Sequence, residues 1–400
     1  MSQLANLDLS VNLWTPPPNA TPLASMAFAA PATSITITTN VERGYESAQV
    51  GYPVVRNQRV IPAALPRELL DWRDLAHVVI SEGSRTLFSG RLTIPQYDGP
   101  AVTGFTAHGY YDLLQSAIHD GADVMRTSGE MVRLTIAGGG NRSWIELGNA
   151  SHWSDPGLEF DLGELSGGTV AQIIEQVVRS GGTDGHQWDF QLWDGNDATS
   201  VVAWLLSRER PSIGAAEYRV PWDNRVRLSY DAREIVTHCR VRYTDETSGT
   251  TNNYTDWYPA TTDHSIENRY GIPSRSVEIQ GGTLSGTVAN SVAAAYFGEF
   301  SRRRWAGTIE RAGAGLELMS GGARPGRYVR ADHSWLMVEG LPDEDGPLLI
   351  HGTTWQSEGD ALQVQVGPGM TSQDALIRGL RERAKAFAEN RSPLTGARWS

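Results

Sequence analysis

The 400-residue chain contains one cysteine, Cys239, and one lysine, Lys385. A single thiol can form no internal disulfide bond and no zinc site built from several thiolates. Cys239 occupies an apolar position of a predicted strand, so we expect a buried and unreactive thiol.

A basic residue near the start of the sequence and long apolar runs are also missing. The first basic residue is Arg43, and the small apolar stretch 24–32 contains Pro31, so we expect no secretion signal. No apolar run is long enough to cross a bilayer, and no membrane-spanning segment is expected. The net charge of −12 would repel phosphate, which argues against stable binding of nucleic acid.

Common catalytic and cofactor motifs are missing. The phosphate-loop sequence Gly-Lys-Ser/Thr is absent, no pair of the nine histidines has helical zinc-ligand spacing, and 281–286 does not match a nucleophile elbow. We therefore expect no enzyme, no metal and no cofactor. One alternative stays open, because the two carboxylates of a glycosidase can be distant in sequence.

Three acidic clusters are predicted to be solvated. Asp263-His264 and Asp332-His333 each place a carboxylate beside an imidazole, but sequence neighbours on a strand point apart. We expect two solvated turn pairs, and a solvated hairpin tip at Asp343-Glu344-Asp345.

Two parts of the chain have the alternating pattern of β-strands. The first runs from Ser34–Val41 to 101–108, and a short helix is expected to follow at Gly109–Leu114. The second begins near residue 223. Its predicted strands are Thr237–Tyr243, 327–331, 334–339, 348–356 and Leu362–Val366.

Helical patterns lie between and after these β parts. Thr169 is a predicted N-cap for a helix over Val170–Val178, and further helices are expected over Asp197–Arg208 and Thr287–Arg303. A last amphipathic helix is predicted over 371–389, with an apolar stripe. The stripe comprises Leu376, Ile377, Leu380, Ala384 and Phe387.

The predicted fold class is mainly β with α+β insertions, consisting of two similar small β-barrel domains, a Trp-rich α+β insert and a C-terminal helix. Six of the 13 tryptophans lie in the insert, where they are expected to form core or subunit interface, with a sugar-binding platform as the alternative. No strict sequence repeat is visible. The predicted domains are 1–118 (arm and first barrel), 119–222 (insert), 223–368 (second barrel, with a helical insertion near 285–305) and 369–400.

Several segments resemble, in their order along the chain, parts of the tail-tip hub proteins of tailed bacteriophages. Asp263–Gly271 is similar to a loop of the second barrel in that family, and Phe88–Leu92 and Phe105–Leu114 resemble strands and a closing helix of its first barrel. Arg240–Tyr243 and Pro325–Val329 resemble two further strands. Ile272-Pro273 departs from the family, which often has a basic residue there.

The resemblance implies a structural role in the virion, after assembly in the host cytoplasm. It implies a homotrimer that closes the tail tube and contacts the tube or a distal tail protein, together with tip, fiber or tape-measure proteins. DNA would pass through its channel. Candidate interface residues are Ser265, Ile266, Tyr270 and Gly271 in the loop, together with the apolar stripe of 371–389.

Two other functions stay open. A distal tail protein would form a hexameric ring and usually has one barrel. A host-polysaccharide binding or cleaving module would use the Trp-rich insert. In the hub, Thr237–Tyr243 and Leu362–Val366 are predicted to be edge strands available for pairing.

Overall fold

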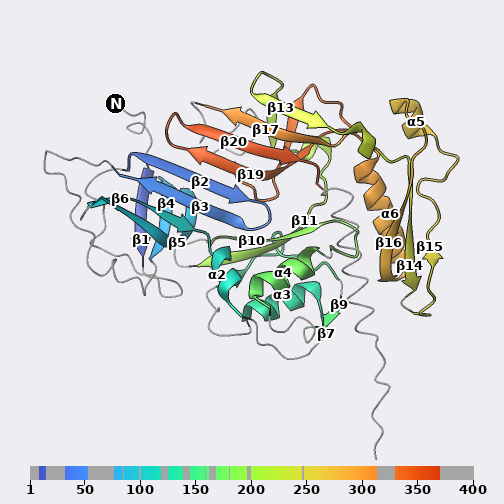
Figure 1. Ribbon diagram of the computed structural model, residues 1–400, viewed down its shortest axis with the longest axis horizontal. Helices are drawn as coiled ribbons and strands as arrows, with labels where there is room; N and C mark the ends of the chain where they lie inside the picture. Colours follow the sequence, from blue (N-terminus) through green and yellow to red (C-terminus); the bar gives the residue numbers. More distant parts are fainter. Residues whose placement is uncertain are drawn as a thin grey trace, which may run out of the picture.

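The computed structural model describes residues 9–14, 32–52, 76–83, 85–98, 101–118, 125–137, 145–157, 159–161, 168–179, 181–195, 200–245, 247–312 and 329–369. Strands dominate these residues, and helices occur in two insertions (Figure 1). The predicted fold class, mainly β with α+β insertions, is confirmed. No helix within the described ranges is long and apolar enough to cross a membrane.

Six strands form what we call the first β unit. In space their order is β1-β4-β5-β6-β3-β2, and every neighbouring pair is antiparallel. Alternation of side chains places Ile35 and Ile37 in the core and leaves Thr36 between them partly exposed. The strands are β1 (Leu9–Trp14), β2 (Ser34–Asn40), β3 (Gly44–Gly51), β4 (His77–Glu82), β5 (Arg85–Asp98) and β6 (Ala101–His108).

A second β unit has the same strand order. Its strands follow the spatial sequence β12-β18-β19-β20-β17-β13, which in both units is the first, fourth, fifth, sixth, third and second strand along the chain. The direction of pairing differs at one place, because β12 pairs with β18 in parallel. The strands are β12 (Tyr218–Pro221), β13 (Val226–Tyr230), β17 (Trp305–Arg311), β18 (Trp335–Glu339), β19 (Leu348–Gln356) and β20 (Ala361–Gly367).

The two units agree in detail as well as in order. The register shifts after Leu92 in β5 and after Ile350 in β19, so both strands have an irregularity at the same place. The amides of these two residues donate to the carbonyls of Ala76 and Ser334 at 2.9 and 3.1 Å, with the same spacing along the chain. The repeat is therefore carried by backbone pairing and not by residue identity.

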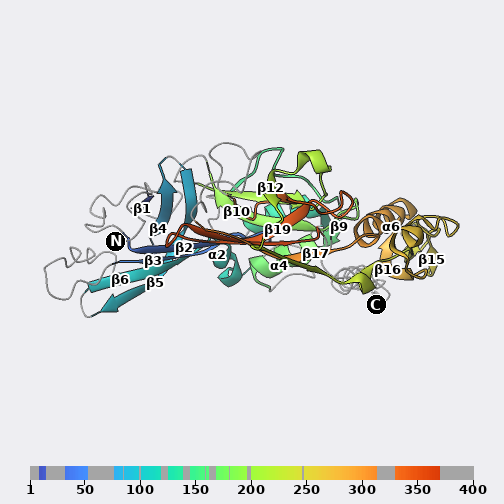
Figure 2. The same cartoon turned by 90° about the horizontal axis from the view of Figure 1, so that it is seen from above.

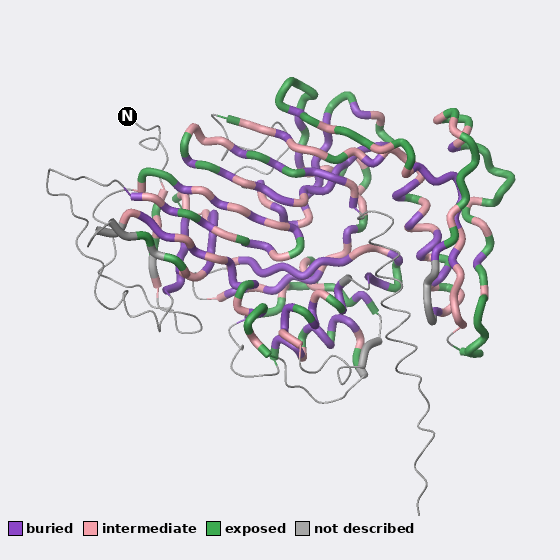
Figure 3. Tube along the Cα trace, viewed as in Figure 1, coloured by how far each residue is buried: buried purple, intermediate pink, exposed green. Residues whose placement is uncertain are grey.

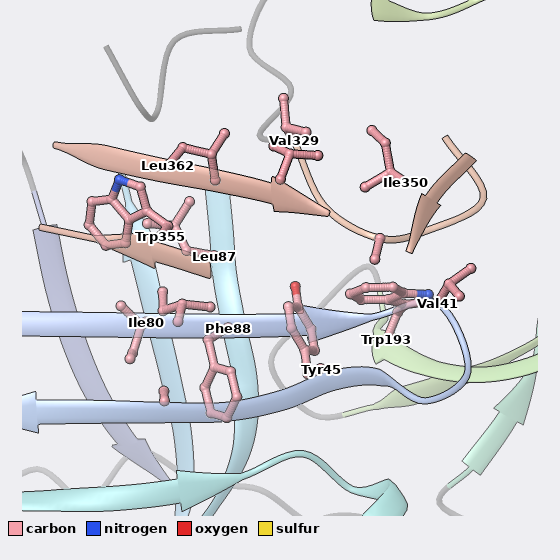
Figure 4. Close-up of a cluster of buried hydrophobic side chains, with 14 of the residues drawn as sticks. Val41, Tyr45, Ile80, Leu87, Phe88, Trp193, Val329, Ile350, Trp355 and Leu362 are labelled. Carbon is pink, nitrogen blue, oxygen red and sulfur yellow. The ribbon is translucent and has the colours of Figure 1, made fainter. Parts of the chain in front are cut away.

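Both units share one sheet and one core. β2 pairs with β19, which joins the units into a long sheet that Figure 2 shows edge-on, with β1, β4 and β12 on the same side of it. Figure 4 shows Phe88 and Tyr45 of the first unit in a cluster with Trp355 and Leu362 of the second. The domain boundaries predicted at 118, 222 and 368 stay predictions.

The α+β insert lies between the two units in sequence and has its own core. Thr169 and Gln172 hydrogen bond reciprocally at the start of α4, as the predicted N-cap requires. The predicted helix over Asp197–Arg208 is wrong, because Val201–Ser207 pairs with β10 as a strand. The elements are α2 (Tyr111–Ser116), β7 (Met125–Thr127), α3 (Ser128–Ala137), β8 (Ile145–Leu147), β9 (Glu159–Asp161), α4 (Val170–Arg179), β10 (Trp188–Asp194) and β11 (Val201–Ser207).

A second insertion separates β13 from β17 and lies at one end of the molecule (Figures 1 and 3). Its sheet has the order β15-β14-β16, and α6 packs on it around the buried Cys239. The helix predicted over Thr287–Arg303 is α6, capped by Ser285. The elements are β14 (His238–Asp245), β15 (Asn253–Tyr254), α5 (Ser265–Tyr270), β16 (Ser276–Leu284) and α6 (Gly286–Phe300), and short 3-10 helices precede β12 (Ile213–Ala215) and β14 (Ala232–Glu234).

We predict that Gly44→Ala destabilises the fold by about 3 kcal/mol. Gly44 has φ +86°, and a Cβ there would lie 2.2 Å from the carbonyl oxygen of Leu192 in β10. Gly340→Ala is the matched control, because its φ is +94° and a Cβ would meet nothing within 4 Å. It should cost only about 1 kcal/mol. Equal losses in chemical denaturation would contradict a close approach of β10 to the β2–β3 turn.

Candidate assembly surfaces

The predicted interface loop forms α5 and its end. Ser265 begins the helix and is exposed, whereas Ile266 is only 9% exposed and anchors the helix. Gly271 ends the helix with φ 64°, and the guanidinium of Arg303 lies 5.4 Å from the Tyr270 ring centroid. The structure therefore gives Ile266 a packing role, and the use of this loop as an interface stays a prediction.

The other candidate interface lies outside the described residues. It is the apolar stripe of Leu376, Ile377, Leu380, Ala384 and Phe387. The predicted helix over 371–389 and its contacts stay predictions.

The predicted edge strands are not at edges. Leu362–Val366 alternates as expected, but β20 lies between β17 and β19. β14, which contains most of Thr237–Tyr243, lies between β15 and β16. Alternation of apolar and polar residues indicates that one face of a strand is exposed to solvent. A central strand has the same pattern when one face of its sheet is solvated, so alternation does not identify an edge strand.

The junction between the two β units is an antiparallel ladder. Trp355 of β19 lies opposite Ile37 of β2, and both are buried. The hydroxyls of Thr39 and Thr353 hydrogen bond across the ladder at 2.6 Å. At one end the Ile35 amide donates to the Ser357 hydroxyl at 2.7 Å. This buried contact joins the two units into one sheet.

A partly buried ionic cluster connects the first unit, the insert and the second unit. Arg330 donates to Asp332 at 2.9 Å and to Asp194 at 3.3 Å, and its guanidinium lies 4.4 Å from the Trp193 ring centroid. Tyr45 of β3 donates to the same Asp194 at 2.5 Å. Burial disfavours the charge on Arg330, but Tyr45, Asp332 and Asp194 outweigh this effect and raise the pKa of Arg330.

A second cluster uses the neighbouring histidine. Arg208 donates to Asp189 at 2.6 Å, and His333 Nε2 lies 2.8 Å from the same carboxylate. Burial alone would raise the pKa of Asp189, but Arg208 and His333 outweigh it and lower that pKa to about 2. The prediction of a solvated Asp332-His333 turn is wrong, because distant parts of the chain cover both residues.

The acidic tip is also partly buried. Asp345 is 2% exposed and accepts a hydrogen bond from the Trp305 indole at 3.1 Å, and Arg303 lies 3.5 Å from its carboxylate. The prediction of a fully solvated hairpin tip is therefore wrong at this residue. Asp263-His264, by contrast, is exposed as predicted.

These clusters are suited to fixing parts of the chain and not to chemistry. Each buried carboxylate is neutralised by an arginine, and no group of three or more metal-binding side chains occurs in the described part of the chain. Burial raises the pKa of the Cys239 thiol to about 12, so it is not a nucleophile near neutral pH. The sequence analysis did not predict the clusters around Arg330 and Asp189. The only sequence signal for them is the presence of polar residues inside apolar segments.

The fold that these features define is that of phage tail proteins. A tail protein of Neisseria meningitidis has a TM-score of 0.50 and 10% identity, over 93% of this chain and 99% of that one. A prophage tail protein of Listeria monocytogenes has a TM-score of 0.50 and 14% identity, over 95% and 100%. No protein-family model matches the chain, and no curated protein matches its sequence. The fold expected from the sequence resemblance is thus confirmed.

We predict that Asp189→Asn lowers the free energy of unfolding by about 3 kcal/mol at pH 7, because Arg208 would stay buried without its main counter-charge. Since folding lowers the pKa of Asp189, its stabilisation is present above about pH 4 and is lost as the pH falls towards 2. The variant should therefore lose less stability than the wild type across that window.

Asp231→Asn is the control for this measurement. Asp231 pairs with Arg233 at 2.6 Å, and hydrogen bonds from Arg233 also lower the pKa of Asp231 to about 2. Because the Arg233 side chain is 90% exposed, solvent screens this pair, and replacing Asp231 should cost much less stability than replacing Asp189. Denaturation curves that move equally for the two variants would contradict a special role of the buried cluster.

Proposed function

We propose that the chain is a structural hub of a phage tail tip. In this role three copies form a ring of pseudo-sixfold symmetry that closes the tail tube, connects it to host-recognition tip proteins and leaves a channel for DNA. The observation that supports it most directly is the presence of two β units with the same strand order in one chain.

The argument is one of symmetry. By family resemblance, tail tubes are built from hexameric rings, and tip proteins are often trimeric. Three chains that each carry two equivalent units present six comparable surfaces to the tube and three to the tip. Closed rings also repeat one interface without open-ended growth.

The negative net charge of the chain suits a channel through which DNA passes. With a net charge of −12, the protein would repel the phosphates of a moving genome and hold no DNA stably. The proposed partners are two further copies, the tube or distal tail protein above, and tip, fiber or tape-measure proteins below. The proposed location is the tail tip of the virion, after assembly in the host cytoplasm.

The proposed role is not enzymatic. The buried carboxylates described above are neutralised in ion pairs, and a thiol with a pKa of about 12 is a poor nucleophile. Trp188, Trp193 and Trp204 of the insert are buried in the cores, which favours packing over a sugar-binding platform. The alternatives are a distal tail protein and a polysaccharide module.

We predict that native mass spectrometry of the purified protein finds a particle of three times the 43.7 kDa chain mass. A hexamer would favour the distal tail protein, and a stable monomer the polysaccharide module. Either result would contradict the hub.

We also predict that the protein releases no reducing ends from host cell envelopes, since Asp189, Asp332 and Asp345, which are buried in the described part of the chain, are each paired with an arginine. Release that a single Asp or Glu substitution abolishes would contradict the structural role and favour the cleaving module.

A further inference from the structure

The junction between the two β units forms where β18 stops pairing with β19. β18 pairs with β19 only at Trp335 and Leu336, and its last contact is the bond from the Ile350 amide to Ser334. Beyond this irregularity, from Gly352 to Gln356, the same side of β19 is paired by β2. β2 thus pairs with the part of this side of β19 that β18 does not pair with.

The first unit has an equivalent stretch of β5 that β4 does not pair with. β4 pairs with β5 as far as His77 and Arg91, and its last contact is the bond from the Leu92 amide to Ala76. Beyond Leu92, no strand among the described residues pairs with that side of β5, whereas β6 pairs with the other side up to Asp98. The segment 93–98 therefore corresponds to the part of β19 that receives β2.

The strand that matches β2 in the second unit is β13. Ile37 pairs with Ala48 just as Leu228 pairs with Gly307, and these partners have equivalent positions beside β6 and β20. β13 pairs with β17 on one side, and within the described ranges its other side has no partner. β13 is the last strand of the long sheet, and β5 lies towards its other end, where only β4 and β1 follow it (Figure 1).

We infer that β13 of one copy pairs antiparallel with segment 93–98 of β5 in the next copy, repeating the β2·β19 ladder between chains. The partner is a second copy of this chain, and the inference rests on the proposed trimeric ring. Transferring the observed register Thr38–Thr354 places Ser229 opposite Gln96. Transferring Thr36–Gln356 places Arg227 opposite Asp98.

The composition of the two edges fits this contact. Tyr230 on β13 is 42% exposed, and the transferred register places it opposite Pro95. Ile94 on β5 is 54% exposed and lies opposite Asp231 in the same register. Arg227 is exposed, and the register would bring it opposite a residue of the other charge. Exposed edges of this kind favour strand addition.

Two constraints make the contact selective. Pro95 can donate no backbone hydrogen bond, and a proline in an edge strand limits indiscriminate pairing. The two edges differ from each other, so the interface is heterologous, and a heterologous contact whose rotation closes builds a ring instead of a two-fold dimer. Three such contacts alternating with three internal ladders would give the pseudo-sixfold ring.

The test uses a double variant, Ser229→Cys with Gln96→Cys, in the full chain. The native Cys239 is buried with a raised pKa and should not interfere. After mild oxidation, we expect covalent dimers and trimers on non-reducing gels. Ser229→Cys with Ile94→Cys is the control, because it places the second thiol two residues out of register, and it should cross-link at least tenfold less.

The outcomes separate this inference from the proposed function. A trimer by native mass without cross-links in the double variant would overturn the strand pairing and leave the ring intact. A monomer by native mass would overturn both. Equal cross-linking of the control would show that the register is wrong.

A charge reversal provides a second measurement. Arg227→Asp should raise the concentration at which half the trimer dissociates by about tenfold, and adding Asp98→Arg should restore most of the loss. Arg225→Asp, two residues earlier on an exposed site before β13, is the control and should have a smaller effect without rescue. A loss that Asp98→Arg does not rescue would contradict the register.

Discussion

The antiparallel pairing of β2 with β19 is the contact on which the rest of the structure depends. It joins residues more than three hundred positions apart in sequence, such as Thr39 and Thr353, and it continues the sheet of one unit into the other. Ile37 and Trp355 become buried together there, so the two units share one core. Without this ladder the chain would present two separate sheets with exposed edges.

The ionic clusters attach the insert to the junction of the two β units. Arg330 and Arg208 neutralise carboxylates from the insert, and Tyr45 contacts Asp194 from the first unit. Buried ion pairs add little net stability relative to apolar packing, but breaking one leaves an uncompensated charge. Their contribution is therefore to fix how the insert sits against both units, and the proposed ring of repeated interfaces would require such a fixed geometry.

Much of the local structure was predictable from the sequence, because periodicity and capping act locally. α4 follows from its apolar spacing and Thr169, and β20 from the alternation of Leu362 with Val364. The predicted helix over Asp197–Arg208 failed because a strand buried on both faces loses its alternation. The buried state of Asp332 and Asp345 depends on residues far away in sequence. The interface assigned to the loop Ser265–Gly271 stays a prediction for the same reason.

The repeat of the two units could not be read from residue identities, since backbone register and not side-chain type carries it. Its most direct test is hydrogen exchange of the backbone amides in β13 and in segment 93–98 of β5, compared between the assembled protein and a dilution at which it dissociates. We expect both segments to be protected in the assembly as strongly as β2 and to lose protection together on dilution. Rapid exchange of both segments in an intact trimer would contradict the repeated ladder.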